Sequence, residues 1–151
     1  MYNLTIGYCG IVTDKMSIVA FSGTEDKLMA AAIMASGAVA NELDVQIFVT
    51  FWGLTRTVKE GKTAPDLSFD GQKMKDKVFA VMKQKNVPDW ITMLKNAKEV
   101  GNIKVYGCAM FADLLDIEKK DLDPIVDDII GVNEFVSLSK DSMTFFISCV
   151  R

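Results

Sequence analysis

The sequence predicts an α/β fold: a single-domain three-layer sandwich in which helices cover a mostly parallel sheet of about five strands. Short apolar and β-branched runs alternate with helical patterns along the chain, which is typical of such sheets. The chain has 151 residues, half of them apolar, and a chain of this size buries roughly two thirds of its unfolded surface in one core. We therefore expect one domain over residues 1–151.

The composition excludes several classes of function. Histidine is absent, which rules out serine-histidine and cysteine-histidine catalytic pairs and histidine metal sites. With 17 basic and 20 acidic side chains, the chain lacks the basic excess that nucleic-acid binding needs. The longest apolar run, residues 28–40, falls short of the ~20 residues of a membrane span. Three dispersed cysteines without a CxxC pair, and no signal-peptide pattern near residue 1, indicate a cytoplasmic location.

The first half of the chain reads as strand, turn, helix and strand. Residues 17–21 form an apolar strand that ends at a Ser-Gly turn, and a helix with an acidic start follows to about residue 43. That helix is apolar nearly all round, so we expect it to be buried, and a subunit interface is one place where that burial could occur. Residues 44–51 form the second strand, whose continuous apolar end suits a parallel sheet covered on both faces. Residues 3–12 fit an extra edge strand or a hairpin, and their pattern does not decide between the two.

The second half continues the alternation after a polar stretch. Residues 56–70 read as a loop or lid, and we expect residues 55–88 to be a variable loop and helix insertion. Helices follow at 72–86, 89–100 and 109–115, strands at 102–107 and 125–130, and a weaker helix and last strand at 132–138 and 143–150. Residues 56–104 are locally basic. We interpret this region as a solvated face, and the less favoured alternative is a rim that attracts anions.

Cofactor and metal motifs are not supported. Gly61-Lys62-Thr63 resembles the end of a phosphate-binding loop, but Arg56 stands where that motif needs its first glycine. No GxGxxG follows a predicted strand. The acidic set of residues 121–128 lacks the spacing of a calcium loop. We expect no cofactor and no metal.

Cys108 is the candidate nucleophile, because it lies where a predicted strand ends and a helix begins. Such ends line the crevice of parallel sheets, and the first turn of a helix stabilises a thiolate. An inert buried cysteine is the alternative, and the position leaves both open. Cys149 lies in the last strand and is expected in the core. Cys9 fits a resolving thiol, although nothing in the spacing places it near Cys108.

Several segments together resemble the DsrE/DsrF-like family of sulfur-relay proteins, in its DsrE2-like, "peroxiredoxin-like" branch. They are SGTEDKLMAAAIMASGAVA at 22–40, FVTFWGL at 48–54, KNAKEVGNIKVYGCAMFADLLDI at 95–117, and the tail with residues 131–135 and TFFIS. The resemblance runs from about residue 17 to 147 and is poor over 55–88. The "peroxiredoxin" label has little support, since the chain shows no thioredoxin-type pattern.

The resemblance implies a five-stranded sheet with flavodoxin-like layering, a homo-oligomer, and a cytoplasmic sulfur carrier. The family's sulfur-accepting cysteine falls on Cys108. Many relatives carry a second cysteine eight residues later, where this chain has Asp116, so a single-cysteine carrier is expected. It would pass sulfane sulfur or a thiosulfonate group between protein cysteines, as a sulfurtransferase-type carrier, with a donor or acceptor such as a TusA-like carrier. Whether it counts as an enzyme stays open.

Further site residues are expected at the neighbouring strand ends. Five of them would shape the crevice: Gly23, Thr24, Trp52, Gly53 and Gly107. Trp52 or Phe111 would shield the bound sulfur from water, and Lys27 and Arg56 would favour an anionic sulfur species. For each of these residues, packing, turn formation or plain solvation is an equal alternative. The competing function is a non-catalytic ligand-binding or scaffolding homo-oligomer with an inert cysteine; an enzyme using a bound nucleotide or flavin has no supporting motif.

Overall fold

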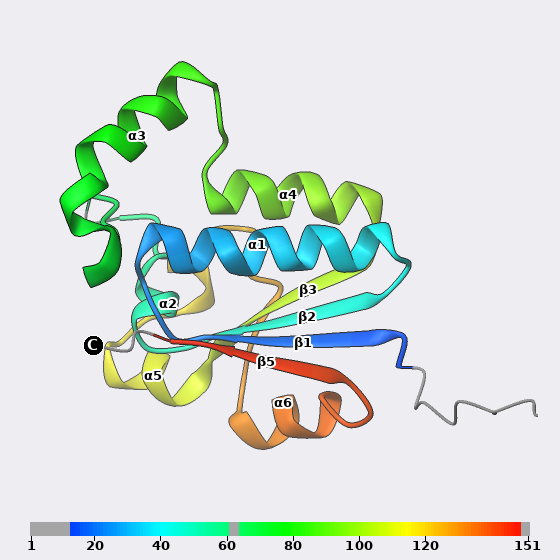
Figure 1. The fold of residues 1–151 in the computed structure, drawn as a ribbon. Helices are drawn as coiled ribbons and strands as arrows, with labels where there is room; N and C mark the ends of the chain where they lie inside the picture. Colours follow the sequence, from blue (N-terminus) through cyan, green and yellow to red (C-terminus); the bar gives the residue numbers. More distant parts are fainter. Residues whose placement is uncertain (1–12, 61–63, 149–151) are drawn as a thin grey trace, which may run out of the picture.

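A computed structural model describes residues 13–60 and 64–148. These residues form one five-stranded sheet in the order β4-β3-β2-β1-β5, and every pairing in it is parallel (Figure 1). The α/β prediction is confirmed, while residues 3–12, Cys9 and Cys149 lie outside the described residues. The strands are β1 (Lys15–Ala20), β2 (Asp44–Val49), β3 (Ile103–Cys108), β4 (Asp128–Ile130) and β5 (Met143–Ile147).

The two faces of the sheet are covered unequally. Helices α1 (Glu25–Ala40) and α4 (Trp90–Val100) lie side by side on one face, and the shorter α6 (Val132–Leu138) lies on the other (Figure 1). Helix α5 (Ala109–Leu114) follows β3 directly at the end where the strands finish. A parallel sheet is normally covered on both faces, so the short α6 leaves apolar sheet surface accessible on its side.

Helix α1 packs through small residues, with Ala31, Ala32 and Ala35 almost fully buried. The expected burial of the helix is confirmed on the side that contacts the sheet and α4, while Ile33 on its outer side is 59% exposed in the single chain; burial of that side between subunits stays a prediction. The sheet and α4 cover only one side of the helix, and alanine side chains on its outer side add little apolar surface.

The chain between β2 and α4 leaves the body of the fold. It contains α2 (Trp52–Thr55), the 3₁₀ helix η1 (Phe69–Met74) and α3 (Lys75–Gln84), which projects from the sandwich (Figure 1). The expected helix over 72–86 is shorter, and no residue of α3 is buried despite its apolar spacing. The segment before α3 is fastened to the start of α1: the Glu25 N–H donates to Asp66 O (2.7 Å) and the Ser68 N–H to Asp26 Oδ1 (2.9 Å).

Strand β4 is shorter than the expected strand over 125–130. It follows the 3₁₀ helix η2 (Lys119–Asp121). The Asp127 carboxylate accepts a hydrogen bond from the Val105 N–H (2.7 Å) and pairs with Lys98 (2.6 Å). The Asp127 side chain thus accepts the hydrogen bond that the Val105 N–H of β3 would otherwise donate to a main-chain carbonyl. The pairing of β4 with β3 therefore begins at residue 128.

Within residues 13–60 and 64–148, no helix combines the length and the apolar content needed to span a membrane.

Candidate functional site

Cys108 is the last residue of β3 and immediately precedes α5. It borders a hollow of about 780 Å³ between the sheet and α6, which we call the cysteine hollow. Strands β1, β2 and β5, together with α5 and α6, supply its walls. The lining residues are Val19, Phe21, Phe48, Thr50, Phe51, Cys108, Met110, Val132, Phe135, Val136, Ser139, Lys140, Thr144 and Phe146.

The hollow is apolar: its described lining includes five phenylalanines and one charged residue, Lys140. Cys108 is only 4% exposed, so its thiol is almost fully buried at the edge of the hollow. The thiol is flanked by apolar walls, and solvent or a substrate reaches it through the hollow. In such surroundings water is scarce, which protects a reactive sulfur species from side reactions.

A stack of aromatic rings forms one wall. The Phe51 ring lies 4.7 Å from the rings of both Phe21 and Phe111, and Trp52 meets Phe111 edge-on at 6.0 Å. Phe51 has φ 47° and ψ −123°, a conformation that favours glycine and costs another residue about 1–3 kcal/mol. The stacking contacts hold the Phe51 ring against the hollow despite that cost. Nothing in the sequence signals this backbone conformation.

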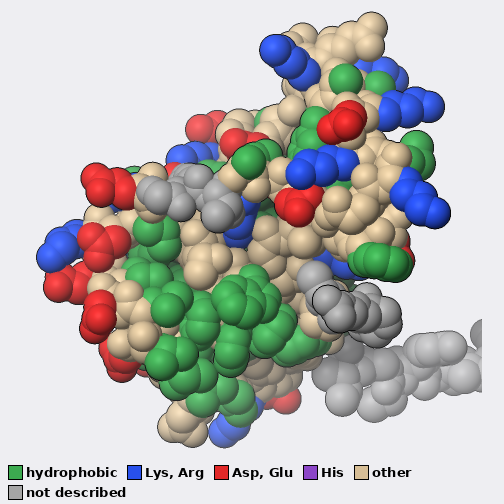
Figure 2. Space-filling model, turned by 90° about the vertical axis from the view of Figure 1, so that its left-hand side faces the viewer, with side chains coloured by type: hydrophobic (Ala, Val, Ile, Leu, Met, Phe, Trp, Pro, Cys, Tyr) green, Lys and Arg blue, Asp and Glu red, His purple; other side chains and the backbone are tan. Residues whose placement is uncertain are grey.

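Exposed apolar side chains surround the mouth of the hollow. They are Met110 (58% exposed), Val132 (63%), Val136 (60%) and Phe146 (63%). Figure 2 shows a broad hydrophobic surface on the end of the molecule where the strands finish, with acidic side chains gathered beside it. A hydrophobic surface with a polar border is typical of a site that contacts another macromolecule.

Gly23, Trp52 and Gly53 join the loops that follow β1 and β2. A Cβ atom on Gly23 would lie 2.5 Å from Trp52 O, and one on Gly53 would overlap Ala20 O. The Gly53 N–H donates to Phe21 O (3.1 Å). These residues do not line the cysteine hollow. They let the two loops approach closely enough for the aromatic wall to form.

The other expected site residues also lie outside the lining. Thr24 precedes α1, and its hydroxyl hydrogen-bonds the Ser22 hydroxyl (3.1 Å). Lys27 lies in the first turn of α1 and is partly exposed. Gly107 packs against Leu54, Leu122 and Ile129. Phe111 is 4% exposed and supports the wall from behind through Phe51.

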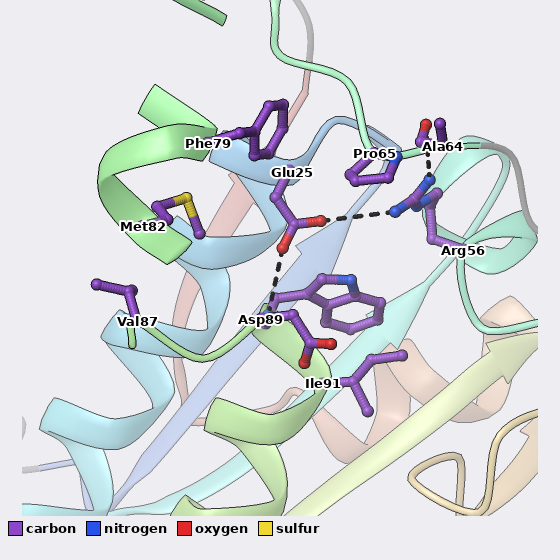
Figure 3. A pocket seen from close by; sticks show the side chains of 10 residues that line it. Glu25, Arg56, Ala64, Pro65, Phe79, Met82, Val87, Asp89 and Ile91 are labelled. Atoms are coloured by element: carbon purple, nitrogen blue, oxygen red, sulfur yellow. Dashed lines mark hydrogen bonds and ion pairs between the residues drawn. The ribbon is translucent and has the colours of Figure 1, made fainter. Parts of the chain in front are cut away.

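A second pocket, of about 440 Å³, lies at the start of α1, on the side of the sheet that α1 and α4 cover; we call it the Glu25 pocket (Figure 3). It contains Arg56, which the sequence analysis associated with the sulfur site. Among the described residues, no three Cys, Asp or Glu side chains gather to hold a metal ion. The lining residues are Glu25, Arg56, Ala64, Pro65, Phe79, Met82, Val87, Asp89, Trp90 and Ile91.

Glu25 is the buried carboxylate of this pocket, with a side chain that is 4% exposed. Its Oε2 lies 3.5 Å from Arg56 Nη2, and its Oε1 accepts a hydrogen bond from the Trp90 N–H at 3.4 Å. Burial raises the pKa of the Glu25 carboxyl, and these two long contacts only partly offset the loss of water.

Asp26, the next residue, behaves in the opposite way. Burial also acts to raise the pKa of its carboxyl, but hydrogen bonds from the Ser68 hydroxyl and N–H outweigh burial, so the pKa is lowered. The pKa values of the adjacent Glu25 and Asp26 carboxyl groups therefore shift in opposite directions, because Asp26 is better supplied with hydrogen-bond donors than Glu25.

Comparisons with known proteins agree with this fold. A model of the DsrE/DsrF/DrsH-like family matches residues 12–80 and 66–146. The uncharacterized protein YrkE of Bacillus subtilis (strain 168) is 34% identical over 161 residues, spanning 89% of this chain and 98% of that protein. The sulfur carrier protein DsrE2 of Allochromatium vinosum is 28% identical over 127 residues, spanning 70% and 80%.

Two solved structures share the architecture at low sequence identity. The ychN protein from E. coli superposes with a TM-score of 0.57 and 21% identity, covering 87% of this chain and 98% of that one. The protein of unknown function MTH1491 from Methanobacterium thermoautotrophicum gives 0.54 and 10%, covering 87% and 97%. At these identities the similarity supports the fold alone.

Proposed function

Because the chain belongs to the DsrE/DsrF/DrsH-like family, we propose that it is a cytoplasmic sulfur carrier that holds sulfur on Cys108. The observation that carries the proposal is the position of this thiol, at a strand end and at the edge of an apolar hollow. A relative that is 28% identical is named a sulfur carrier, which supports the same chemistry. Asp116 occupies the place of a second cysteine in the resemblance, so one thiol carries the sulfur.

The proposed reaction is a group transfer without net oxidation. The Cys108 thiolate attacks the outer sulfur of a donor persulfide, R–S–SH; a new S–S bond forms and the donor leaves as the thiolate R–S⁻. An acceptor thiolate later attacks the outer sulfur on Cys108 and regenerates its thiolate. With a thiosulfonate donor, R–SO₂–S⁻, the leaving group is the sulfinate R–SO₂⁻.

The apolar lining suits this reaction in two ways. Sulfur species are less strongly hydrated than oxygen nucleophiles, and phenylalanine walls accept a polarisable atom readily. The hollow also limits the access of water and oxidants to the loaded sulfur. The exposed apolar residues at its mouth supply a surface on which a protein donor or acceptor, such as a TusA-like carrier, can dock.

The test is intact-mass measurement after incubation with an organic persulfide or thiosulfonate. Wild-type protein should gain the mass of added sulfur, reversed by a reducing thiol, and Cys108→Ser should gain none. The matched control is the double variant Cys9→Ser/Cys149→Ser, which should load like the wild type. Equal loading of Cys108→Ser, or no loading of wild type by donors that load a control thiol, would overturn the proposal.

The competing function is a non-catalytic ligand-binding or scaffolding homo-oligomer. The near-complete burial of Cys108 and the apolar surface around the hollow favour it, because both fit a surface that another chain covers. Light scattering gives the subunit number, and the mass experiment gives the state of the thiol. An oligomer whose Cys108 remains unloaded would establish this second function; a loaded oligomer would establish a carrier that is also oligomeric.

A further inference from the structure

We propose that the Glu25 pocket is a second binding site, which takes a small organic cation: an ammonium group carried on an apolar body. It lies on the opposite side of the sheet from the cysteine hollow and shares no lining residue with it. The site is therefore separate from the proposed sulfur chemistry.

The charges around the pocket favour a cation. Among the described lining residues, two carboxylates, Glu25 and Asp89, face one guanidinium, that of Arg56. Arg56 is already engaged, with Nη2 towards Glu25 (3.5 Å) and Nη1 donating to Ala64 O (3.5 Å). An incoming anion would meet both carboxylates and would have to compete with these contacts, whereas a cation would balance the excess negative charge.

Glu25 is poorly supplied with close donors for so buried a carboxylate. Its two contacts, at 3.4 and 3.5 Å, lie at the outer limit of hydrogen bonding and ion pairing. A charge-assisted hydrogen bond from an ammonium group is shorter, about 2.7–2.9 Å, and roughly twice as strong as a neutral one. A bound ammonium would therefore replace the hydrogen bonds from water that the Glu25 carboxylate has lost on burial.

The remaining wall fits an apolar body. Phe79 and Met82 of α3 lie on the side of Glu25 away from Arg56 (Figure 3). An ammonium group can enter there without displacing Arg56, beside the Phe79 ring that attracts cations. Val87 extends the same apolar wall beside Met82, and Ile91 lies across the pocket from it (Figure 3).

Helix α3 gives independent support. It projects from the body of the fold, and none of its residues is buried, although it carries apolar side chains at helical spacing (Figure 1). Phe79 and Met82 line the Glu25 pocket. The apolar body of a ligand would cover these side chains, and an amphipathic helix is stabilised when its apolar face is buried.

Binding should depend on pH. The charged groups that face Glu25 are Asp26 on its own helix, Arg56 after α2, and Asp89 before α4. Burial raises the pKa of the Glu25 carboxyl above its usual value, and only the ionised carboxylate attracts an ammonium. The affinity should therefore rise as the pH rises through the pKa of Glu25 and become constant above it.

The experiment is calorimetric titration of the full chain with phenethylammonium, 2-phenylethanol and 3-phenylpropionate, which share an apolar body and differ in charge. Amide chemical shifts of Trp90 locate the site. We expect saturable binding of phenethylammonium, about tenfold tighter than the alcohol, as a charge-assisted contact provides, and no binding of the carboxylate.

Two variants and a control complete the test. Glu25→Gln should weaken phenethylammonium binding about tenfold or more. Asp89→Asn keeps an acceptor for the Thr92 N–H that Asp89 caps and should weaken binding several-fold, which keeps the test decisive if Glu25→Gln folds poorly. Glu99→Gln, at an exposed position, should bind like the wild type. Equal affinity for amine and alcohol, preference for the carboxylate, or unchanged binding in both pocket variants would overturn the proposal.

Discussion

The cysteine hollow and the Glu25 pocket are built by the same two loops and have opposite chemistry. The loops after β1 and β2 send Phe21 and Phe51 to the α6 side, and Glu25 and Arg56 to the α1 side. One site offers a thiol among phenylalanines, and the other offers buried charges beside an apolar helix. A close contact between two loops can thus support two binding sites that differ entirely in what they attract.

The largest effect is expected from Phe111→Ala, which removes a buried ring behind the wall of the cysteine hollow alone. The loss of packing should lower the free energy of unfolding by about 3–5 kcal/mol, measured by urea denaturation. If the protein still folds, sulfur loading should fall while phenethylammonium binding is retained. Loss of both functions to the same degree would show that the two sites do not behave separately.

Gly53→Ala should disturb both sites together. The added Cβ would overlap Ala20 O, so the two loops must separate, at a cost of about 1–3 kcal/mol. The matched control is Gly37→Ala in α1, where a Cβ meets nothing within 4 Å; it should stabilise the protein by about 0.5–1 kcal/mol. Equal effects of the two substitutions on urea denaturation would contradict the role assigned to the loop contact.

Val136→Asp sharpens the comparison by placing a charge at the mouth of the cysteine hollow. Val136 is 60% exposed, so stability should change by no more than about 0.5 kcal/mol. Loading from a protein donor should slow about tenfold, through the loss of apolar contact at a docking surface, while loading from a small neutral persulfide stays close to wild type. Equal slowing with both donors would show that the mouth does not act in docking.

The smallest effects concern the two neighbouring carboxyl groups. The pKa of Glu25 is raised by burial, so its contribution to stability is present below about pH 4.5 and is lost as the pH rises through the raised value. The pKa of Asp26 is lowered on balance, so its contribution is present above about pH 3.8 and is lost as the pH falls through the lowered value.

Urea denaturation of Glu25→Gln and Asp26→Asn across pH tests these signs. The stability of the wild type relative to Glu25→Gln should decrease as the pH rises, and relative to Asp26→Asn it should increase over the acidic range. Parallel pH dependences for the two variants would contradict the opposite environments of these groups.

Much of the fold could be predicted because the apolar periods are clear. The five strands and α1, α4, α5 and α6 all lie within a few residues of their expected bounds. Helix α3 also forms within the expected range of 72–86, but its amphipathic spacing did not reveal that none of its residues would be fully buried. The start of β4 depends on the Asp127 side chain, and a tertiary hydrogen bond of that kind leaves no local pattern.

The candidate site was predictable only in part. A strand-to-helix junction marks the place of Cys108 from local pattern alone. The phenylalanines that line the cysteine hollow come from β2, β5, α6 and the loops after β1 and β2. The pairing of β5 with β1 brings Phe146 and Phe21 to the same side. The order of strands in a sheet is a property of the whole fold, so the local sequence does not show that β5 lies beside β1. Likewise, the sequence suggested that Arg56 favours an anionic sulfur species, whereas in the structure its guanidinium lies against Glu25.

The backbone at Phe51 has a consequence for anyone who wishes to reshape the cysteine hollow. At this position the side chain and the main-chain conformation cannot be altered independently: a smaller residue would widen the chamber, but it would also give up the ring contacts that oppose the unfavourable torsion angles. Glycine would accept the torsions and leave the wall empty. Enlarging the cysteine hollow while preserving its outline therefore has to start from Phe135 or Val136 of α6, where the backbone is an ordinary helix that other residues can adopt.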